Sequence, residues 1–422
     1  STSETQWLSA VYTGNGTGKR RNDMKEKQWG ETLYITALIA WLLVGLIKYT
    51  YFKDMLPMKL ISDPVMYGVL SCCLVKIILE ADRTPRNLLM LGVTLLFMWI
   101  AFKIDKLPFA AMFALIYGGR NVSFRKLCRI MFWVQLLLFL ITVLAAKAGV
   151  LEDVLWEEGV RNRHGLGFTH CMLASHFGLF TAIAWISEKN RLREFAALVI
   201  LISNGILYYL TNGRSDFLLS ILLVVSCLVC ERFFAKKKFP QWFAYALMLV
   251  PWICLIASIG VTMAYQKGNP VWEKWNYISN NRLKLGYEAI VQYGFTWFGQ
   301  KIRFIGASTL YYKPDAVYNY VDNAYLMHML LYGTVFILVY CVLMSLLLYR
   351  LVMQNEKMLL MCVLISMVFG MANPQSMYLT YNPLLLLLVR ENGTLGGTEV
   401  KGMRNELSNG KKEEKVYESV SL

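Results

Sequence analysis

The sequence predicts an all-α polytopic membrane protein with about twelve transmembrane helices. Of its 422 residues, 56% are hydrophobic and 17% are charged, whereas a typical soluble domain has about 25% charged residues. Apolar runs of about 17–25 residues recur along the chain, and this is the length that crosses about 30 Å of hydrocarbon. Lysine and arginine residues gather between alternate runs, which is the pattern that orients helices across a bilayer.

The apolar runs divide the chain into twelve expected spans. The fourth run, residues 107–119, is the shortest, so we expect a helix there that is re-entrant or tucked between other helices. We expect the spans at residues 31–47, 60–80, 87–102, 107–119, 127–150, 168–187, 194–211, 216–233, 241–264, 323–349, 357–371 and 376–389.

The distribution of positive charge places both termini in the cytoplasm. With the N-terminus inside, 26 of the 43 lysine and arginine residues fall in inner segments and 8 fall in short outer loops. A further 7 lie in one long outer loop, which is discounted because long loops cross the membrane regardless of their charge. The net charge of +15 therefore indicates a cytoplasmic collar and excludes a nucleic-acid partner as its explanation.

The predicted organisation has five parts. Residues 1–30 form a basic cytoplasmic tail without the apolar region of a signal peptide, and residues 31–264 form nine spans. Residues 265–322 form the long extracytoplasmic loop, and residues 323–389 form three further spans. Residues 390–422 form a polar cytoplasmic tail that we expect to be disordered.

Cysteine and histidine residues predict neither a disulfide framework nor a metal site. The nine cysteines fall within or at the ends of spans, and the four histidines have no metal-ligand spacing. Cys227 and Cys230 form a CxxC pair, but on a helix in lipid they are expected to be small apolar filler. We expect no cofactor, because the sequence contains no P-loop or dinucleotide fingerprint.

The long outer loop is rich in aromatic residues. Residues 265–321 hold 14 aromatic residues among 57, whereas aromatic residues make up 14% of the whole chain. Such side chains either anchor a loop at the lipid headgroups or offer faces on which sugar rings stack. Within the loop, the run NNRLKLGYEAIVQYG predicts an amphipathic helix with one apolar face. That face would consist of Leu283, Tyr287, Ile290 and Val291.

Four arginines stand on the predicted outer face. Arg161 and Arg163 follow an acidic stretch, so ion pairs with those carboxylates are the alternative to a functional role. For Arg214, in a turn between two spans, the alternative is a snorkelling interface residue, and for Arg282 it is a headgroup contact. A guanidinium keeps its charge and matches phosphate oxygens in a bidentate way. The group therefore predicts a site for a lipid phosphate or diphosphate.

Asp322 and Asn323 stand at the start of the tenth expected span. A carboxylate at this border either caps the helix, together with Asn323, or acts as a general base. His328 is six residues further on, which is about 9 Å along a helix axis. We therefore expect His328 to lie too deep to reach the same substrate atom.

The chain contains four motifs in this order: RHGLGFTH, TNGRSDFLL, NRLKLGYEAIVQYG followed by FGQ, and DNAYLMHMLLYG. This ordered set resembles the Wzy-type polysaccharide polymerases, which belong with the O-antigen ligases among membrane glycosyltransferases. The resemblance covers about residues 120–390 and has two departures. Cys171 and Met172 stand where relatives often have Pro and Asn, and Asp322 stands where the ligase branch typically has His, which favours the polymerase branch.

The resemblance implies a GT-C-like multi-pass protein of the bacterial cytoplasmic membrane, acting on its outer face. It implies transfer of a glycan from a polyprenyl-diphosphate-linked oligosaccharide donor to a second lipid-linked unit, with inversion and without metal or cofactor. A partner protein that regulates chain length is also implied. Asp322 and Arg214 would be catalytic, as base and leaving-group stabiliser. The implied substrate-binding residues are Arg161, Arg163, Arg282, His170, Asn323 and Tyr325.

Two other functions stay open at this point. A ligase would use the same fold but transfer the glycan to a different acceptor, so only a polymerase would build a ladder of repeat units. A transporter or flippase for lipid-linked sugars would favour inverted repeats and charged or broken helices at mid-membrane. The sequence shows little of either: Lys76 and Lys147 lie near span ends, and Asn204 is the mid-span polar residue that stands out.

Overall fold

The computed structural model describes residues 28–80, 84–158, 161–313 and 315–390. The predicted terminal tails lie almost wholly outside the described residues. The backbone of Arg161 is described, but its side chain is not.

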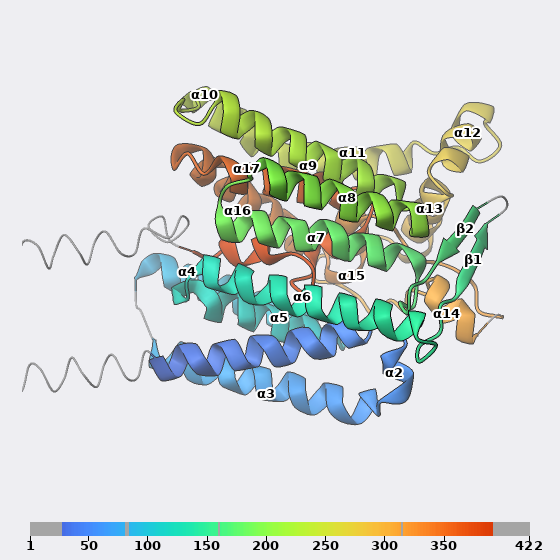
Figure 1. Ribbon diagram of the computed structural model, residues 1–422, viewed down its shortest axis with the longest axis horizontal. Coiled ribbons are helices and arrows are strands. Elements are labelled where there is room, and N and C mark those ends of the chain that lie inside the picture. Colours follow the sequence, from blue (N-terminus) through green and yellow to red (C-terminus); the bar gives the residue numbers. More distant parts are fainter. Residues whose placement is uncertain (1–27, 81–83, 159–160, 314, 391–422) are drawn as a thin grey trace, which may run out of the picture.

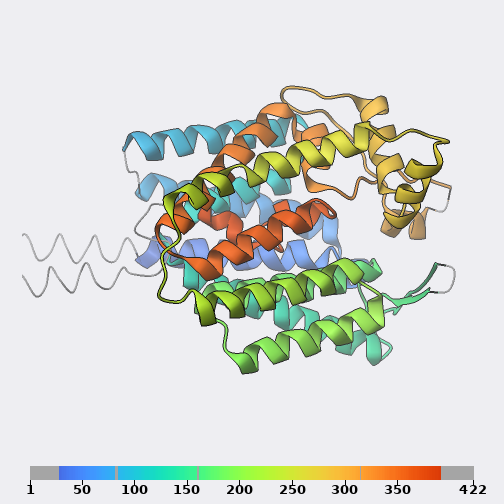
Figure 2. The ribbon, with the colours of Figure 1, turned by 90° about the horizontal axis from the view of Figure 1, so that it is seen from above.

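The described chain is predominantly helical, and eight of its helices are long and apolar enough to cross a membrane. This agrees with the predicted multi-pass membrane protein. The long helices run along a common direction (Figures 1 and 2). They are the helix Gln28–Ile47, α3 (Met58–Leu79), α4 (Pro85–Lys103), α6 (Phe124–Lys147), α7 (Cys171–Lys189), α8 (Glu194–Thr211), the pair α10 (Gln241–Met248) and α11 (Val250–Met263), and α16 (Thr334–Met353).

Three further helices belong to the bundle. The helix α9 (Arg214–Phe233) is 20 residues long but has charged residues at both ends, and α17 (Lys357–Gly370) has 14 residues. The helix α5 (Leu107–Gly118) is buried from Phe109 onward and packs against α3 and α4. It is therefore tucked inside the protein, as expected for this short run. Two short elements, α2 (Phe52–Met55) and η1 (Gly119–Asn121), connect longer helices.

Two of the last three predicted spans differ from the structure. The expected span 323–349 is broken at Gly333 into α15 (Ala324–Tyr332) and α16. The expected span 376–389 is not an α-helix but a buried, irregular segment with two 3₁₀ turns, η2 (Pro374–Met377) and η3 (Pro383–Leu387). Irregular backbone is tolerated at membrane depth where protein surrounds it and satisfies its polar groups. Gln135 does so here, because its side-chain amide donates to the carbonyls of residues 380 and 381 at 2.9 Å.

A two-stranded hairpin corrects the all-α prediction. The strands β1 (Leu155–Glu158) and β2 (Arg161–His164) pair antiparallel, with Trp156 opposite Arg163. Asp153 fixes the base of the hairpin, since its carboxylate lies 3.0 Å from His164 Nδ1 and accepts the Leu166 N–H at 2.6 Å. The apolar period of the flanking spans gives no hint of this short polar hairpin.

The outer loop contains three helices: α12 (Pro270–Ile278), α13 (Arg282–Tyr293) and α14 (Ala307–Tyr312). The helix α13 confirms the predicted helix, and small residues form the face that packs against the protein. Tyr287 and Val291 are exposed, whereas Gly286 and Ala289 are buried. The reason is close packing: a Cβ at Gly286 would lie 2.8 Å from the Thr262 methyl group of α11.

The hairpin and the loop helices gather at one end of the bundle. Residues 28 and 390, where the described chain begins and ends, lie at the other end (Figure 1). The strand β2, the start of α9 and the start of α13 lie at the same end, where each contributes an arginine to one cavity. Side chains from distant parts of the sequence therefore meet there.

Candidate functional site

A large cavity opens at the end of the bundle that carries the hairpin and the loop helices. Its volume is about 1480 Å³, which exceeds the range of roughly 300–1,000 Å³ usual for small-molecule sites. Most of the predicted site residues line it together. They are Arg163, His170, Arg214, Arg282 and Asp322, joined by His176.

The hairpin presents Arg163 to the cavity. The strand β2 holds Arg163 opposite Trp156, and only 6% of the surface of Arg163 is accessible. The Trp156 ring lies 5.3 Å from the ring of His170, so the hairpin also contacts the start of α7. A short polar strand thus brings a buried guanidinium to the site.

Arg214 is the first residue of α9 and follows a tight turn. Asn212 has a φ of 53°, and its side-chain oxygen accepts a hydrogen bond from Arg214 Nε at 3.4 Å. A Cβ at Gly213 would lie 2.4 Å from Ser175 Oγ, so a glycine is required for the turn to approach α7 this closely. The turn leaves the Arg214 side chain exposed at the cavity.

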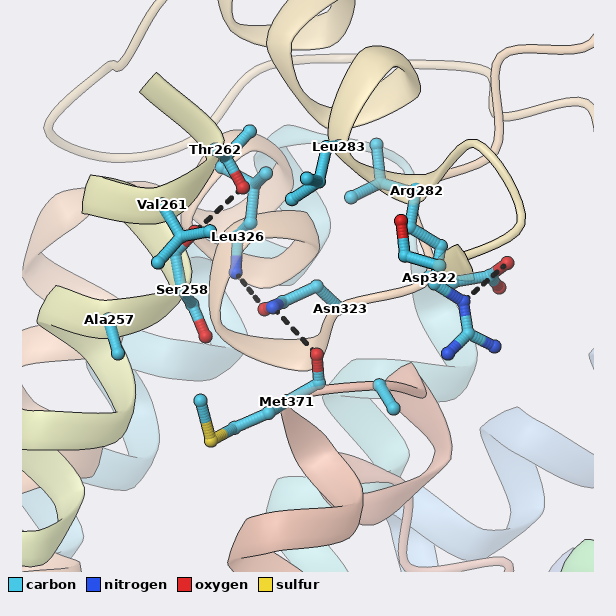
Figure 3. Close-up of a pocket in the computed structure, with 13 residues that line it drawn as sticks. Ala257, Ser258, Val261, Thr262, Arg282, Leu283, Asp322, Asn323, Leu326 and Met371 are labelled. Atoms are coloured by element: carbon cyan, nitrogen blue, oxygen red, sulfur yellow. Dashed lines mark hydrogen bonds and ion pairs between the residues drawn. The ribbon is translucent and has the colours of Figure 1, made fainter. Parts of the chain in front are cut away.

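Arg282 starts α13 and forms an ion pair with Asp322, with 3.6 Å between Nε and Oδ2. Asn276 fixes the start of this helix, because its side chain bonds to Asn281 Oδ1 and to the Lys284 N–H, both at 3.0 Å. Figure 3 shows the Arg282–Asp322 pair at the edge of a second, smaller pocket of about 250 Å³. The Arg282–Asp322 pair therefore lies between the large cavity and the smaller pocket and lines both.

His170 is buried beside two guanidinium groups. Burial lowers the pKa of His170 to about 4, and the neighbouring groups His176, Arg163 and Arg282 add to the lowering. The His170 ring caps α7, because its Nδ1 accepts the Met172 N–H at 3.3 Å, so the neutral ring carries its proton on Nε2. The guanidinium groups of Arg163 and Arg282, and not the neutral ring, therefore supply the positive charge with which an anion would pair.

Asp322 is less stable as an anion than an ordinary carboxylate. Its side chain keeps 28% of its surface open to the cavity, yet the surrounding protein desolvates it. Burial raises the pKa of Asp322, and the charges of Arg282 and His176 oppose that rise only in part. The neutral carboxyl is therefore favoured in the folded state relative to the unfolded chain.

Asp322→Asn is expected to stabilise the protein at neutral pH. Because the folded state raises the pKa of this carboxyl, its ionisation lowers the free energy of unfolding once the pH exceeds that pKa. An amide removes this penalty, so we expect the apparent melting temperature to rise by about 1–3 °C at pH 7. Near pH 4 the gain should shrink. Thermal unfolding of the purified protein in detergent measures both. A loss of stability at pH 7 would contradict the prediction, because it would mean that the ion pair with Arg282 contributes more than the burial of Asp322 costs.

A buried His176–Asp216 pair was not predicted from the sequence. His176 on α7 and Asp216 on α9 are 97% and 99% buried at their side chains, and His176 Nδ1 lies 2.8 Å from Asp216 Oδ1. His176 lines the cavity. The sequence does contain one indication of this pair: His176 lies within the expected span 168–187, and an ionisable residue within a membrane span is a candidate functional residue by default.

The remaining predicted residues lie away from the large cavity. Asn323 lines the smaller pocket and caps α15: its Oδ1 accepts the Leu326 N–H at 3.0 Å, and its amide donates to the Met371 carbonyl at 2.9 Å (Figure 3). Tyr325 is 99% buried in the core and lines neither space, since α15 turns it toward α11 and α17. His328 is also in the core, 5.5 Å from the ring of Tyr332. The side chain of Arg161 lies outside what the structure describes.

The aromatic residues of the outer loop include some that line the cavity and others that are exposed on the surface. Three tyrosines of the loop and one at the end of the first helix line the cavity, whereas Trp275 and Trp297 are exposed, with accessible fractions of 59% and 68%. Both predicted uses of these side chains, anchoring and stacking, thus have candidates. The cavity-lining tyrosines are Tyr49, Tyr277, Tyr318 and Tyr320.

The site combines anion-binding groups with proton acceptors. Three guanidinium groups and Lys284 face the same space as the carboxylate of Asp322 and the ring of His176. Among the described residues there is no group of three or more His, Cys, Asp or Glu side chains that could hold a metal ion. Compared with known proteins, the chain matches no family model, no curated protein and no solved structure.

Proposed function

We propose that this protein polymerises polyprenyl-diphosphate-linked oligosaccharides into a surface polysaccharide. The observation that carries the proposal is the convergence of Arg163, Arg214 and Arg282, from three distant parts of the chain, on one cavity. A diphosphate is a strong match for several guanidinium groups in a partly desolvated site. The ordered sequence motifs that resemble Wzy-type polymerases support the same activity.

In this proposal the arginines bind the donor diphosphate and stabilise the negative charge that develops on it as it leaves. Such preorganised charge is usually the largest single contribution to catalysis. The cavity volume of about 1480 Å³ suits sugars of both a donor and an acceptor, and its tyrosines offer faces for the rings. The smaller pocket behind Arg282, with Val261, Leu283 and Leu326 in its wall, suits the first isoprene units of the lipid.

The proposal includes an orientation. The end of the bundle that carries residues 28 and 390 faces the cytoplasm of a bacterial cell, and the cavity faces outward. This follows the excess of lysine and arginine in the inner segments of the sequence. Twelve crossings and a GT-C-like arrangement are part of the same proposal, and so is a partner protein that sets chain length.

The proposed activity is tested with the purified protein in liposomes. The substrate is lipid-linked oligosaccharide extracted from a strain that assembles the repeat unit but lacks this protein, supplied with no other enzyme, with and without EDTA. We expect a ladder of repeat units on a gel, and we expect it to persist in EDTA because arginines supply the charge stabilisation.

Each other result has a defined meaning. A single transfer to a different lipid acceptor, without a ladder, would replace the polymerase with a ligase. Protein-dependent movement of the lipid-linked sugar across the bilayer, without transfer, would replace it with a flippase. A ladder that EDTA abolishes would keep the polymerase but contradict its metal independence.

A further inference from the structure

His176 and Asp216 form a hydrogen-bonded pair within the wall of the cavity. His176 Nδ1 lies 2.8 Å from Asp216 Oδ1, and the two side chains are 3% and 1% accessible. The pair joins α7 to α9 two residues after Arg214, so it is adjacent to the arginines that would bind the diphosphate. Phe369 closes the other side of the imidazole, with the two rings edge to face at 5.1 Å.

The burial of Asp216 is costly and only partly compensated. Within the described part of the chain, its Oδ2 is buried without a hydrogen-bond partner, and a buried carboxylate without full pairing costs free energy. Asp216 lies in the first turn of α9, where the helix dipole offsets some of that cost. A group held at such a cost beside a cavity is a candidate functional group.

The geometry fixes which nitrogen of His176 is available. An ionised Asp216 only accepts hydrogen bonds, so Nδ1 carries the proton and donates it. The neutral ring then has its lone pair on Nε2, which makes no hydrogen bond to any described residue, in a side chain that lines the cavity. A carboxylate that orients a histidine and stabilises its imidazolium is a recurrent arrangement for a general base.

We propose that His176 is the general base of this site and that Asp216 is its positioning residue, an assignment that rests on the function proposed above. The acceptor hydroxyl loses its proton to His176 Nε2 while its oxygen forms a bond to the anomeric carbon of the donor. The bond between that carbon and the diphosphate oxygen breaks, and its electron pair leaves with the polyprenyl diphosphate. The imidazolium is paired with Asp216 until it returns the proton to water.

Asp322, the base expected from the sequence, has different neighbours from His176. Its carboxylate faces Arg282 at 3.6 Å, so a guanidinium competes for the lone pairs that a base would use. His176 lies near enough to Asp322 and His170 to interact with both, while Asp216 is its partner on the other side. In this arrangement Asp322 helps Arg282 to hold its orientation, and His176 takes the proton.

The test compares His176→Gln, Asp216→Asn and Asp322→Asn in the liposome assay under single-turnover conditions between pH 5 and pH 9. Glu356→Gln is the control, because Glu356 also accepts a hydrogen bond across two elements, from the Asn190 side-chain amide at 2.7 Å, but lies beyond the other end of α7 and does not line the cavity. Binding of farnesyl diphosphate, a soluble short-chain diphosphate, is measured for each variant by tryptophan fluorescence. Thermal unfolding identifies any variant that fails to fold.

We expect His176→Gln to slow transfer about 10²–10⁴-fold with farnesyl diphosphate affinity within about threefold of the original protein. The decline of the original protein's rate at acid pH should disappear from the residual activity of this variant, because a glutamine side chain takes up no proton. Asp216→Asn should also slow transfer by at least about 100-fold, because an amide can stabilise the wrong tautomer. Glu356→Gln should retain activity.

Each of the following results would overturn the assignment. His176 is excluded as the base if the folded His176→Gln protein keeps more than a tenth of the original rate. It is also excluded if the rate of this variant declines at acid pH as the rate of the original protein does. An equal loss of diphosphate binding and transfer would make the pair structural. If the unchanged protein builds a ladder and only Asp322→Asn abolishes it, the proposed function stands and Asp322 is the base. If the unchanged protein builds no ladder, the proposed function fails, and the assignment of His176 fails with it.

Discussion

Arg214→Ala is expected to lower the rate of chain elongation about 10²–10³-fold, the loss that follows removal of one donor to a developing anion. The guanidinium is the first group of α9 and faces the cavity from the turn between α8 and α9. Its weak bond to Asn212, at 3.4 Å, leaves most of its donors for a ligand. Elongation in liposomes at saturating substrate measures the effect.

Arg214→Lys separates charge from geometry. A lysine keeps the positive charge but cannot make the two parallel hydrogen bonds of a guanidinium, so we expect an intermediate loss of about 10-fold or more. Arg303→Ala is the matched control, because Arg303 is an exposed arginine of the same outer loop that does not line the cavity. Elongation by Arg214→Ala within about threefold of the original rate would exclude the diphosphate clamp.

The sequence predicted the helices and the participants in the site better than their packing. Arginines on polar segments between apolar runs stand out by composition, and Arg163, Arg214 and Arg282 do share a cavity. The buried face of α13 could not be predicted in the same way. A hydrophobicity pattern selects large apolar residues, whereas the contact with α11 requires the small Gly286 and Ala289.

The break at Gly333 and the irregular segment after α17 were missed for a related reason. Apolar runs of suitable length are read as continuous helices, and neither run contains an Asp, Glu, Lys or Arg residue. The positive φ of Gly333 and the helix-starting prolines 374 and 383 mark the deviations, but their meaning depends on neighbours. Gln135, 245 residues away from Thr380, satisfies that irregular backbone.

The His176–Asp216 pair shows how distance in the sequence hides a site. The two residues are 40 positions apart and are joined only because α7 and α9 approach closely. Gly213 permits that approach at the α9 turn, where a side chain would meet Ser175. The motif that contains Arg214 includes Asp216, yet nothing in the sequence names the histidine that the carboxylate contacts.

Gly333→Ala is expected to destabilise the protein severely. Gly333 has a φ of 91° and a ψ of 169°, a conformation almost restricted to glycine, with a cost of about 1–3 kcal/mol for other residues. A Cβ there would also lie 2.4 Å from the Gly299 nitrogen and 2.5 Å from the Trp297 carbonyl oxygen. Because backbone atoms cannot yield as a flexible side chain does, we expect a total loss of about 3 kcal/mol or more.

The loss should spread from the break to the outer loop. The first N–H groups of α16 have no partner within the helix, and the loop supplies them: Thr334 N–H donates to the Thr296 carbonyl at 2.8 Å, and Val335 N–H to the Trp297 carbonyl at 3.1 Å. If an alanine at 333 forces the loop away, these bonds break and the segment that leads to Asp322 loses its anchor. Protease cleavage within residues 294–300 and elongation activity should therefore change together.

Gly260→Ala is the control for this substitution. Gly260 lies within α11, and a Cβ there would meet no atom within 4 Å, so alanine should leave stability unchanged or raise it slightly, as expected for a helical glycine. Thermal unfolding and limited proteolysis of both variants in the same detergent decide the point. An apparent melting temperature of Gly333→Ala equal to that of Gly260→Ala would contradict the docking of the loop on the α15–α16 break, and with it the anchoring of this wall of the cavity.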